Sequence, residues 1–248
     1  MSKRCSARRR ISGCDPNDVV QTGISFERRA APDREGGAMR VIAGIYRGRR
    51  LLSPTGDRVR PTSDKVKEAI FNMLGASVVD ASVVDLFAGT GGLGIEALSE
   101  GANVCWFCDN SGESVALLRR NLSLLGVGTE GRVIHADFRR ALREIATRAG
   151  GTEVKSSVAP LPGVVDLIFV DPPYERGYYD EVMQILATYD MMSPGGLVVM
   201  ERAADPRAEE RVFPGFRRLK SKRYGHTTVD IYERTEDERQ KDALRGYL

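Results

Sequence analysis

A short motif, Asp171-Pro172-Pro173-Tyr174, follows an apolar run that predicts a buried strand over residues 165–170. The Asp171 carboxylate and the Pro172 carbonyl are two oxygen acceptors, which can hold the two hydrogens of an aromatic amine and stabilise positive charge developing on its nitrogen. Consecutive prolines restrict the backbone and so hold these acceptors in place. Tyr174 offers a flat ring on which an extruded base can stack. These four residues are therefore predicted to catalyse a reaction at the exocyclic amino nitrogen of a nucleobase.

A glycine-rich loop lies upstream, between a strand predicted over residues 83–87 and a helix. Gly89, Gly91 and Gly94 fit the pattern GxGxxG, in which glycine lets the backbone approach a ligand closely. By itself the pattern suits both a nicotinamide dinucleotide and S-adenosylmethionine. Asp85 at the head of the loop favours S-adenosylmethionine, because a carboxylate can hold a cationic amino-acid end directly or through water.

Two more acids follow neighbouring strands. Asp109 closes the next predicted strand, where a ribose-binding acid belongs. Asp137 comes after the third strand and is placed to bind an adenine amino group, with Phe138 beside the ring; a helix N-cap is a compatible role for Asp137. The predicted cofactor-binding residues are Asp85, Phe87, Ala88, Gly89, Thr90, Gly91, Gly94, Asp109, Asn110, Asp137, Phe138 and Asp171.

Strands and helices must alternate to position these loops. Strands are predicted over residues 40–44, 49–52, 83–87, 103–108, 132–136, 165–170, 197–201, 217–222 and 224–233. Helices are predicted over residues 93–100, 114–125, 139–148 and 178–189, and another begins after Thr62 or Ser63 and continues to Leu74. This order predicts an α/β fold, in which helices cover both faces of a parallel sheet.

Composition divides the chain into four regions. Residues 1–38 mix Arg, Gly, Pro and Asp without apolar periodicity and predict a disordered leader. Residues 39–75 are predicted to form a hairpin and a helix, residues 76–235 the catalytic domain, and residues 236–248 a charged tail. No apolar run follows the basic start or approaches the ~18 residues of a membrane helix, so neither a secretory signal nor a membrane partner is expected.

Cysteine and histidine are sparse. The four cysteines favour a reducing, cytoplasmic compartment, and Cys105 and Cys108 are interpreted as buried strand residues rather than a redox pair. With two histidines and no ligand spacing, no metal site is expected.

Basic residues gather near both ends of the chain, although the net charge is only +3. One cluster lies between Arg40 and Lys67 and another between Arg217 and Arg223. Such clusters favour a polyanion partner, and a solvated basic face explains the charge alone equally well.

Taken together, these motifs resemble the RsmD family of bacterial 16S rRNA guanine-N2 methyltransferases. The likeness runs from Met39 to about Arg234. Its specific part is the block Arg60-Pro61-Thr62-Ser63-Asp64-Lys65-Val66-Lys67-Glu68-Ala69-Ile70-Phe71-Asn72, whereas many amino-methyltransferases share the glycine loop and the Asp-Pro-Pro-Tyr motif. Among its departures from the family pattern, Asp109 stands where Glu is usual, and Lys67 replaces a usual Arg.

The resemblance implies a class I S-adenosylmethionine-dependent methyltransferase fold, which is Rossmann-like, with a mostly parallel seven-stranded sheet and a small N-terminal hairpin and helix. It implies methylation of N2 of a guanine in 16S rRNA, within the small ribosomal subunit or an assembly intermediate. The protein is expected to be a monomer. The residues implied to bind RNA are Arg40, Arg47, Arg49, Arg50, Arg60, Thr62, Lys65 and Lys67.

Two other functions remain open at this point. The Asp-Pro-Pro-Tyr motif also suits methylation of adenine N6 or cytosine N4 in DNA or RNA, although little chain remains for a DNA-recognition region. A ribosome-assembly factor that binds RNA without catalysis is the alternative outside the enzymes. Methylation at cytosine C5 is disfavoured, because that reaction needs a cysteine nucleophile and no cysteine here follows a proline.

Overall fold

The computed structural model describes residues 39–54, 63–149, 165–173, 177–189, 191–204 and 211–235. All of them belong to one compact unit that spans Gly37–Leu248. The predicted leader and charged tail, and the predicted site residues Arg60, Thr62 and Tyr174, lie outside the described residues. No helix in the described part is long and apolar enough to cross a membrane.

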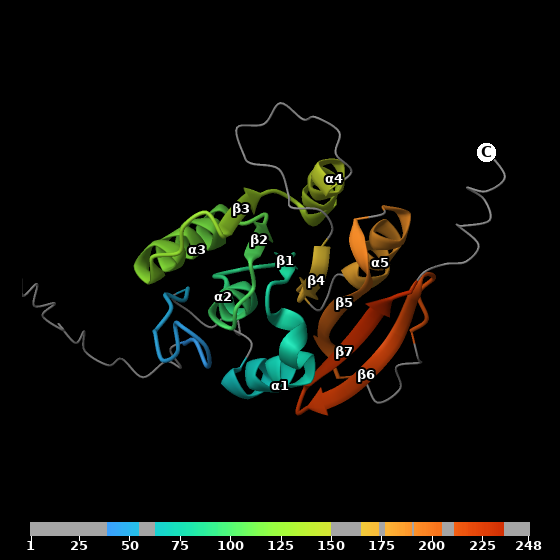
Figure 1. The fold of residues 1–248 in the computed structure, drawn as a ribbon, viewed down its shortest axis with the longest axis horizontal. Coiled ribbons are helices and arrows are strands. Elements are labelled where there is room, and N and C mark those ends of the chain that lie inside the picture. The colour runs from blue at the N-terminus through green and yellow to red at the C-terminus, as the bar shows by residue number, and fades with distance from the viewer. Residues whose placement is uncertain are drawn as a thin grey trace, which may run out of the picture. The chain divides into compact units, whose positions relative to one another are not determined.

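Seven strands form one sheet in the order β3-β2-β1-β4-β5-β7-β6 (Figure 1). The strands are β1 (Ser82–Asp85), β2 (Val104–Asp109), β3 (Gly131–His135), β4 (Val165–Val170), β5 (Met192–Ala203), β6 (Phe216–Tyr224) and β7 (Thr227–Arg234). The five strands from β3 to β5 are parallel, whereas β7 is antiparallel to both β5 and β6. The mostly parallel, seven-stranded sheet predicted from the sequence is therefore confirmed.

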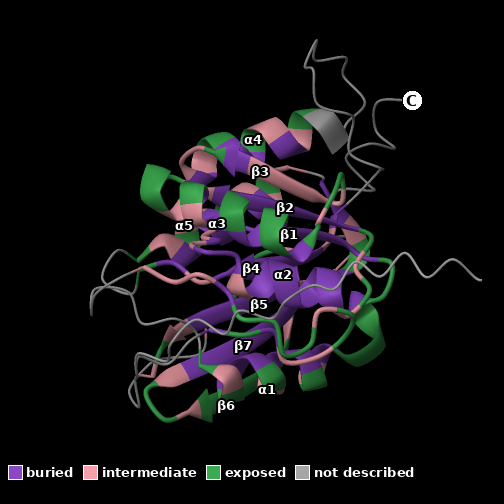
Figure 2. Cartoon of the chain, turned by 90° about the vertical axis from the view of Figure 1, so that its left-hand side faces the viewer, coloured by how far each residue is buried: buried purple, intermediate pink, exposed green. Residues whose placement is uncertain are grey.

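Helices cover both faces of the sheet. They are α1 (Asp64–Leu74), the 3-10 helix η1 (Gly75–Val78), α2 (Gly92–Ser99), α3 (Gly112–Leu125), α4 (Phe138–Ala149) and α5 (Tyr178–Thr188). One apolar core joins α1, α2 and α3 to the sheet, and a second joins α4 and α5 to its other face. Because both faces are covered, the central strands are buried along their length (Figure 2).

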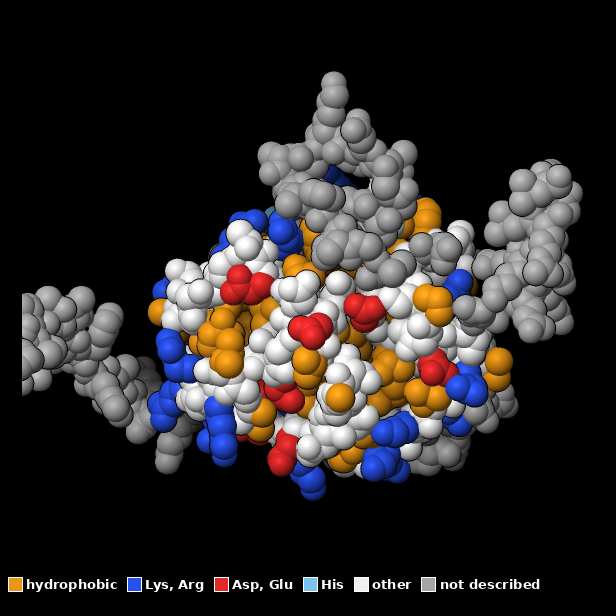
Figure 3. Space-filling model, in the orientation of Figure 1, with side chains coloured by type: hydrophobic (Ala, Val, Ile, Leu, Met, Phe, Trp, Pro, Cys, Tyr) orange, Lys and Arg blue, Asp and Glu red, His pale blue; other side chains and the backbone are white. Residues whose placement is uncertain are grey.

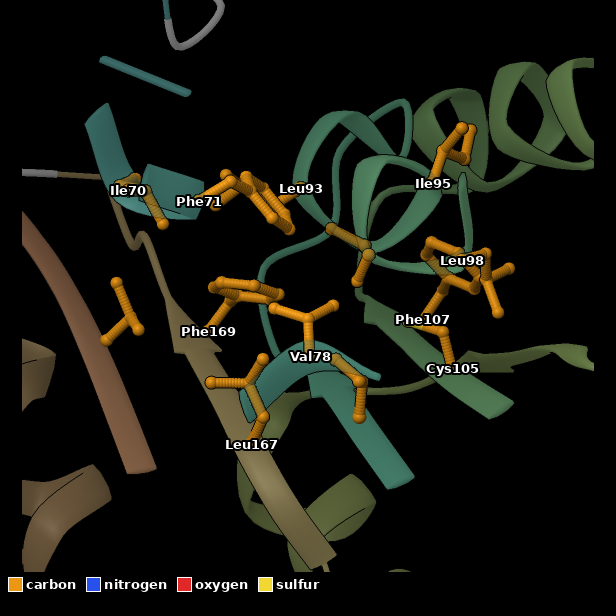
Figure 4. Close-up of a cluster of buried hydrophobic side chains, with 14 of the residues drawn as sticks. Ile70, Phe71, Val78, Leu93, Ile95, Leu98, Cys105, Phe107, Leu167 and Phe169 are labelled. Atoms are coloured by element: carbon orange, nitrogen blue, oxygen red, sulfur yellow. The ribbon is translucent and has the colours of Figure 1, made fainter. Parts of the chain in front are cut away.

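Helix α1 begins and packs as its sequence predicts. The Ser63 hydroxyl accepts a hydrogen bond from the Val66 amide and so caps the first turn. Its apolar stripe, which includes Ile70 and Phe71, faces the sheet, and the Phe71 ring lies 5.8 Å from the ring of Phe169 on β4 (Figure 4). Helix α1, the first helix of the described chain, thus shares an apolar core with the strands that carry the site.

The predicted N-terminal hairpin is present but shorter than predicted. A single antiparallel bridge joins Arg40 to Arg50, and residues 39–54 contain no strand longer than this bridge. The reason is a competing acceptor: the Glu96 carboxylate of α2 takes the amides of Ile42 and Ala43 at 2.7–3.0 Å. The segment therefore docks on α2 and pairs with itself only briefly, through bonds such as those from the Val41 amide to the Arg49 carbonyl and from the Leu51 amide to the Met39 carbonyl.

The two strand cysteines are core residues. Cys105 and Cys108 are free thiols with no exposed surface, and they belong to the cores on opposite faces of the sheet. Burial raises the pKa of both thiols well above the ordinary value. The sequence interpretation as small apolar residues is confirmed, and a redox pair is excluded.

Candidate active site

The loops that follow β1 and β4 leave the sheet side by side. Asp85 at the end of β1 is the register partner of Phe169, and the Leu86 amide donates to the Phe169 carbonyl at 3.1 Å. From β1 the chain continues to strands on one side, and from β4 to strands on the other. This is the switch point of an open α/β sheet, where ligands bind beyond the carboxyl ends of the strands. Asp171, directly after β4, therefore lies beside the glycine loop.

The glycine loop combines open space with tight packing. Gly89 has a φ of 54°, and a Cβ built on it would meet nothing within 4 Å, which leaves room for a ligand against the backbone. Gly94 has no such room, because a Cβ there would lie 2.3 Å from the Phe107 ring of β2. The first glycine thus leaves space beside the backbone, and the last allows close packing of α2 on the sheet.

Asp85 is a buried carboxylate that lacks a cationic partner in the described part of the chain. It is 2% exposed, and its Oδ2 accepts a hydrogen bond from the Gly94 amide at 2.9 Å. Burial raises the pKa of Asp85 to about 7; the bond from Gly94 opposes this rise, and the charge of Asp109 adds to it. An ammonium group bound beside Asp85 would favour the ionised carboxylate.

Asp109, at the end of β2, accepts hydrogen bonds from the loop after β1 and from the loop after β2. Its Oδ2 accepts from the Gly89 amide and its Oδ1 from the Ser111 amide, each at 2.8 Å. The side chain is half-buried, so lone pairs remain available to the hydroxyls of a ribose. Asn110 is exposed, and its carbonyl lies 3.3 Å from the Nε2 atom of His135.

Asp137 caps α4 and pairs with the helix's second residue. Its Oδ1 accepts from the Arg139 amide at 3.0 Å, and its Oδ2 lies 3.2 Å from the Arg139 guanidinium. Arg139 also makes a two-pronged ion pair with Glu181 of α5. The capping role foreseen for Asp137 is therefore present, and Arg139 links the loop after β3 to α5.

Three aromatic rings meet beside these loops. Phe87 follows β1, Phe138 is the first residue of α4 and Tyr178 is the first residue of α5. The Phe87 and Phe138 centroids are 5.4 Å apart, and Phe87 stacks on Tyr178 at 6.0 Å with an angle of 5° between the rings. Sequence reasoning selected the two phenylalanines but missed Tyr178, Arg139 and Glu181. The only local signal was a tyrosine that opens the helix after the Asp-Pro-Pro-Tyr motif.

The described part of that motif is graded in exposure. Asp171 is half-buried, Pro172 is buried and Pro173 is exposed. Pro172 is thus buried directly after β4, whereas part of the surface of Asp171 remains exposed. The motif therefore starts where a ligand between β1 and β4 would lie.

Most of the described basic residues of the N-terminal segment are at the surface. Arg40, Arg47, Arg50 and Lys65 are exposed, and Figure 3 shows Lys and Arg side chains over this segment. Arg40 pairs with Asp64 at 2.9 Å. Arg49 is also exposed, and it donates to the Leu124 carbonyl of α3 at 2.7 Å. These five side chains can reach a polyanion.

Lys67 corrects the sequence prediction. It has no exposed surface, and its Nζ lies 3.0 Å from Glu96 Oε2 and 2.5 Å from the Arg40 carbonyl. A lysine enclosed by a carboxylate and a carbonyl cannot contact RNA, so its role is structural. Lys67 follows the apolar Val66 on the buried side of α1, which was the available signal.

The chain is similar in sequence to known proteins over most of its described length. The family model described as Conserved hypothetical protein 95 matches residues 39–233. Bacillus subtilis YlbH, whose name assigns it provisionally to the rRNA methyltransferases, is 36% identical over 196 residues, or 79% of this chain and 99% of YlbH. Ribosomal RNA small subunit methyltransferase D of Escherichia coli is 32% identical over 171 residues, or 68% of this chain and 78% of that protein.

The fold is also similar to that of a solved structure. The Escherichia coli protein yhhF, titled provisionally as a methyltransferase, superposes with a TM-score of 0.66 at 29% identity, over 81% of this chain and 100% of yhhF. Fold and switch-point loops together define a class I S-adenosylmethionine-dependent methyltransferase. Within that class, the chain belongs to the RsmD family.

Proposed function

We propose that this protein transfers the methyl group of S-adenosylmethionine to the exocyclic N2 amino group of a guanine in 16S rRNA of the small ribosomal subunit. The choice of rRNA rests on family membership, since relatives at 36% and 32% identity bear rRNA methyltransferase names. The observation that carries catalysis is the position of Asp171, directly after β4 and beside the glycine loop that follows β1.

The residues at this edge fit S-adenosylmethionine. Asp85 is a buried carboxylate without a cation in the described part, which suits the ammonium group of the amino-acid end. Gly89 opens onto free space, and Asp109 is half-buried and braced by two amides, which suits the ribose hydroxyls. Asp137 would hold the adenine amino group, with Phe138 at the ring.

Bound S-adenosylmethionine supplies a methyl group on a sulfonium, which leaves as a neutral thioether. The protein's part is to make a weakly nucleophilic amine reactive and to align it. Asp171 and the Pro172 carbonyl accept the two amino hydrogens, which favours a tetrahedral nitrogen and stabilises its growing positive charge. One of these protons is lost as the new N–C bond forms, through Asp171 to water. Fixed alignment contributes the rest of the rate enhancement.

Replacing the carboxylate tests this assignment. Asp171→Ala is expected to reduce methyl transfer by about 10²–10³-fold, the typical effect of removing one group that stabilises transition-state charge. Tritiated methyl transfer to small subunits from a strain that lacks the gene measures the rate, and mass spectrometry of the digested nucleosides identifies the product. Titration with S-adenosylhomocysteine should still show binding, because the other predicted cofactor-binding residues are unchanged.

Several results would contradict the proposal. Unchanged activity in Asp171→Ala would remove Asp171 from the mechanism. Methyladenosine or N4-methylcytidine in the digest would replace the guanine assignment with another amino-methyltransferase activity. Failure of the wild-type protein to bind S-adenosylhomocysteine would favour an RNA-binding assembly factor without catalysis.

A further inference from the structure

The β6–β7 hairpin forms one border of the sheet and runs to the same edge as Asp171. Two successive antiparallel pairings, β5 with β7 and β7 with β6, make β6 parallel to β4 and β5. The carboxyl end of β6 and the turn that follows it therefore lie at the carboxyl edge of the sheet.

The pairing register shows how far the hairpin extends. Val170 is level with Met200, Met200 with Asp230, and Asp230 with Ser221. Every residue of β6 after Ser221, and the turn to β7, thus lies beyond the row in which β4 ends. Asp171 leaves β4 on that same side. The hairpin tip therefore borders the carboxyl edge of the sheet, where Asp171 lies, and we call it the rim of that edge. It is three strand spacings, or about 14 Å, from β4.

Basic residues in the amino half of β6 have structural partners. Arg217 forms an ion pair with Glu233 of β7. Lys220 donates from Nζ to the Met73 carbonyl at the end of α1, at 3.0 Å. Both interactions hold the hairpin to its neighbours, so this half is explained by the fold.

The tip differs from that half. Lys222 and Arg223 are exposed; Lys222 has no partner in the described part, and Arg223 donates only from Nε, to the Gly225 carbonyl at 2.9 Å. Strand β6 contains no acid. The acid nearest in register, Asp230, is 1% exposed and already pairs with Arg202 at 2.6 Å. Within the described residues, the tip therefore carries positive charge that no acid of β6 and no acid level with it on β7 compensates. Figure 3 shows Lys and Arg side chains over the region of β6 and β7.

We propose that the tip of the β6–β7 hairpin binds the phosphate backbone of the 16S rRNA beside the target guanine, with Lys222 and Arg223 as the phosphate-binding cations. Phosphates are the groups that exposed, unpaired Lys and Arg bind on RNA, and such interactions position the nucleic acid without reading its sequence. The hairpin tip and the exposed N-terminal arginines lie on separate elements of the fold. Together they would hold the RNA strand at more than one place. This inference rests on the proposed function for the identity of the RNA.

The test removes charge at the two ends of one strand. The variant Lys222→Ala/Arg223→Ala loses the tip cations, and Arg217→Ala is the matched control for a cation on the same strand outside the rim. Binding to small subunits from a strain that lacks the gene is measured between about 50 and 200 mM salt, together with KM and kcat for methyl transfer. Thermal unfolding and S-adenosylhomocysteine affinity serve as folding controls.

For the double variant, we expect the slope of log K against log salt to fall by about 0.7 for each phosphate that is no longer neutralised, which corresponds to about fivefold per phosphate at 0.1 M salt and roughly 25-fold for two. KM for subunits should rise accordingly while kcat stays near wild type, and Arg217→Ala should bind like wild type. An unchanged slope and affinity would overturn the proposal, as would an equal effect of Arg217→Ala. Weaker binding with an unchanged slope would assign the interaction to a ribosomal protein and also overturn it. Hairpin-dependent binding without any methyl transfer by wild type would support this inference while refuting the proposed function.

Discussion

Two buried carboxylates in adjacent elements have opposite surroundings. Glu96 of α2 is 1% exposed and accepts from the Lys67 ammonium and from the amides of Ile42 and Ala43. Asp85 at the end of β1 is 2% exposed and has one described donor, the backbone amide at the start of α2. One acid is fully compensated by the protein, and the other is not.

This difference separates a structural acid from a candidate functional one. A buried charge costs several kcal/mol unless a partner compensates it. The Lys67–Glu96 pair provides that compensation and fastens the N-terminal segment and α1 to α2. For Asp85 the cost appears as a pKa raised by burial to about 7. An uncompensated acid at a ligand-binding edge is where a cationic ligand gains most.

Breaking the compensated pair should have the largest effect. Lys67→Met leaves Glu96 buried without its cation, so we expect the free energy of unfolding to fall by about 3–5 kcal/mol, measured by urea denaturation. The double variant Lys67→Met/Glu96→Gln removes both charges and keeps an acceptor for the Ile42 and Ala43 amides. It should recover much of the loss. If Lys67→Met were as stable as wild type, the pair would not hold the N-terminal segment in place.

Removing the uncompensated charge should affect the ligand more than the fold. Asp85→Asn keeps an oxygen for the Gly94 amide but cannot balance an ammonium group. A hydrogen bond to a charged group contributes about 1.5–3 kcal/mol, so the affinity for S-adenosylhomocysteine should fall roughly 10–100-fold in calorimetric titration. Unchanged affinity would show that Asp85 serves only the loop.

The same variant has a defined pH signature. Because the folded-state pKa of Asp85 is about 7 and its ordinary value is 3.8, the folded protein retains a proton that the unfolded chain loses. The stability of the ligand-free protein should therefore decrease as the pH rises from about 4 to 7, and Asp85→Asn should lack this contribution. Affinity for S-adenosylhomocysteine should increase between about pH 6 and 8 in the wild type alone, since the ammonium favours the carboxylate.

An exposed ion pair in the same region sets the lower end of the scale. Arg40 and Asp64 are 2.9 Å apart, but their side chains are 60% and 41% exposed. Asp64→Asn should change the free energy of unfolding by less than about 1 kcal/mol, because water and salt screen such pairs. Urea denaturation at low and high salt checks this. A loss comparable to that of Lys67→Met would show that exposure does not separate the two pairs.

The predictions from sequence succeeded where the signal was local. Strand β4 was predicted with its observed bounds, and α1 begins at the predicted Ser63 cap, because apolar periodicity and capping chemistry act within a few residues. Strand β5 begins earlier than predicted, at Met192 rather than at residue 197. Met192 pairs with Val165 of β4, but the register shifts before Leu197, so the segment with Pro194 and two glycines forms an irregularity ahead of the regular pairing.

Long-range partners were not predictable. Arg139 and Glu181 lie 42 positions apart and Lys67 and Glu96 lie 29 apart, and nothing in either local sequence indicates the pairing. Lys67 therefore read as one more cation in a basic segment. The uncommitted charge at the hairpin tip was likewise indistinguishable from the paired Arg217 on the same strand.

The order of motifs along the chain was enough to determine the α/β class, the glycine loop and the acid after the fourth parallel strand. These features depend on backbone preferences and side-chain chemistry, which act within a few residues. Only the tertiary structure decided which charged groups pair within the protein and which remain available to ligands. That division depends on burial and on partners tens of residues away, since the energy of a charge depends on its surroundings rather than on its neighbours in sequence.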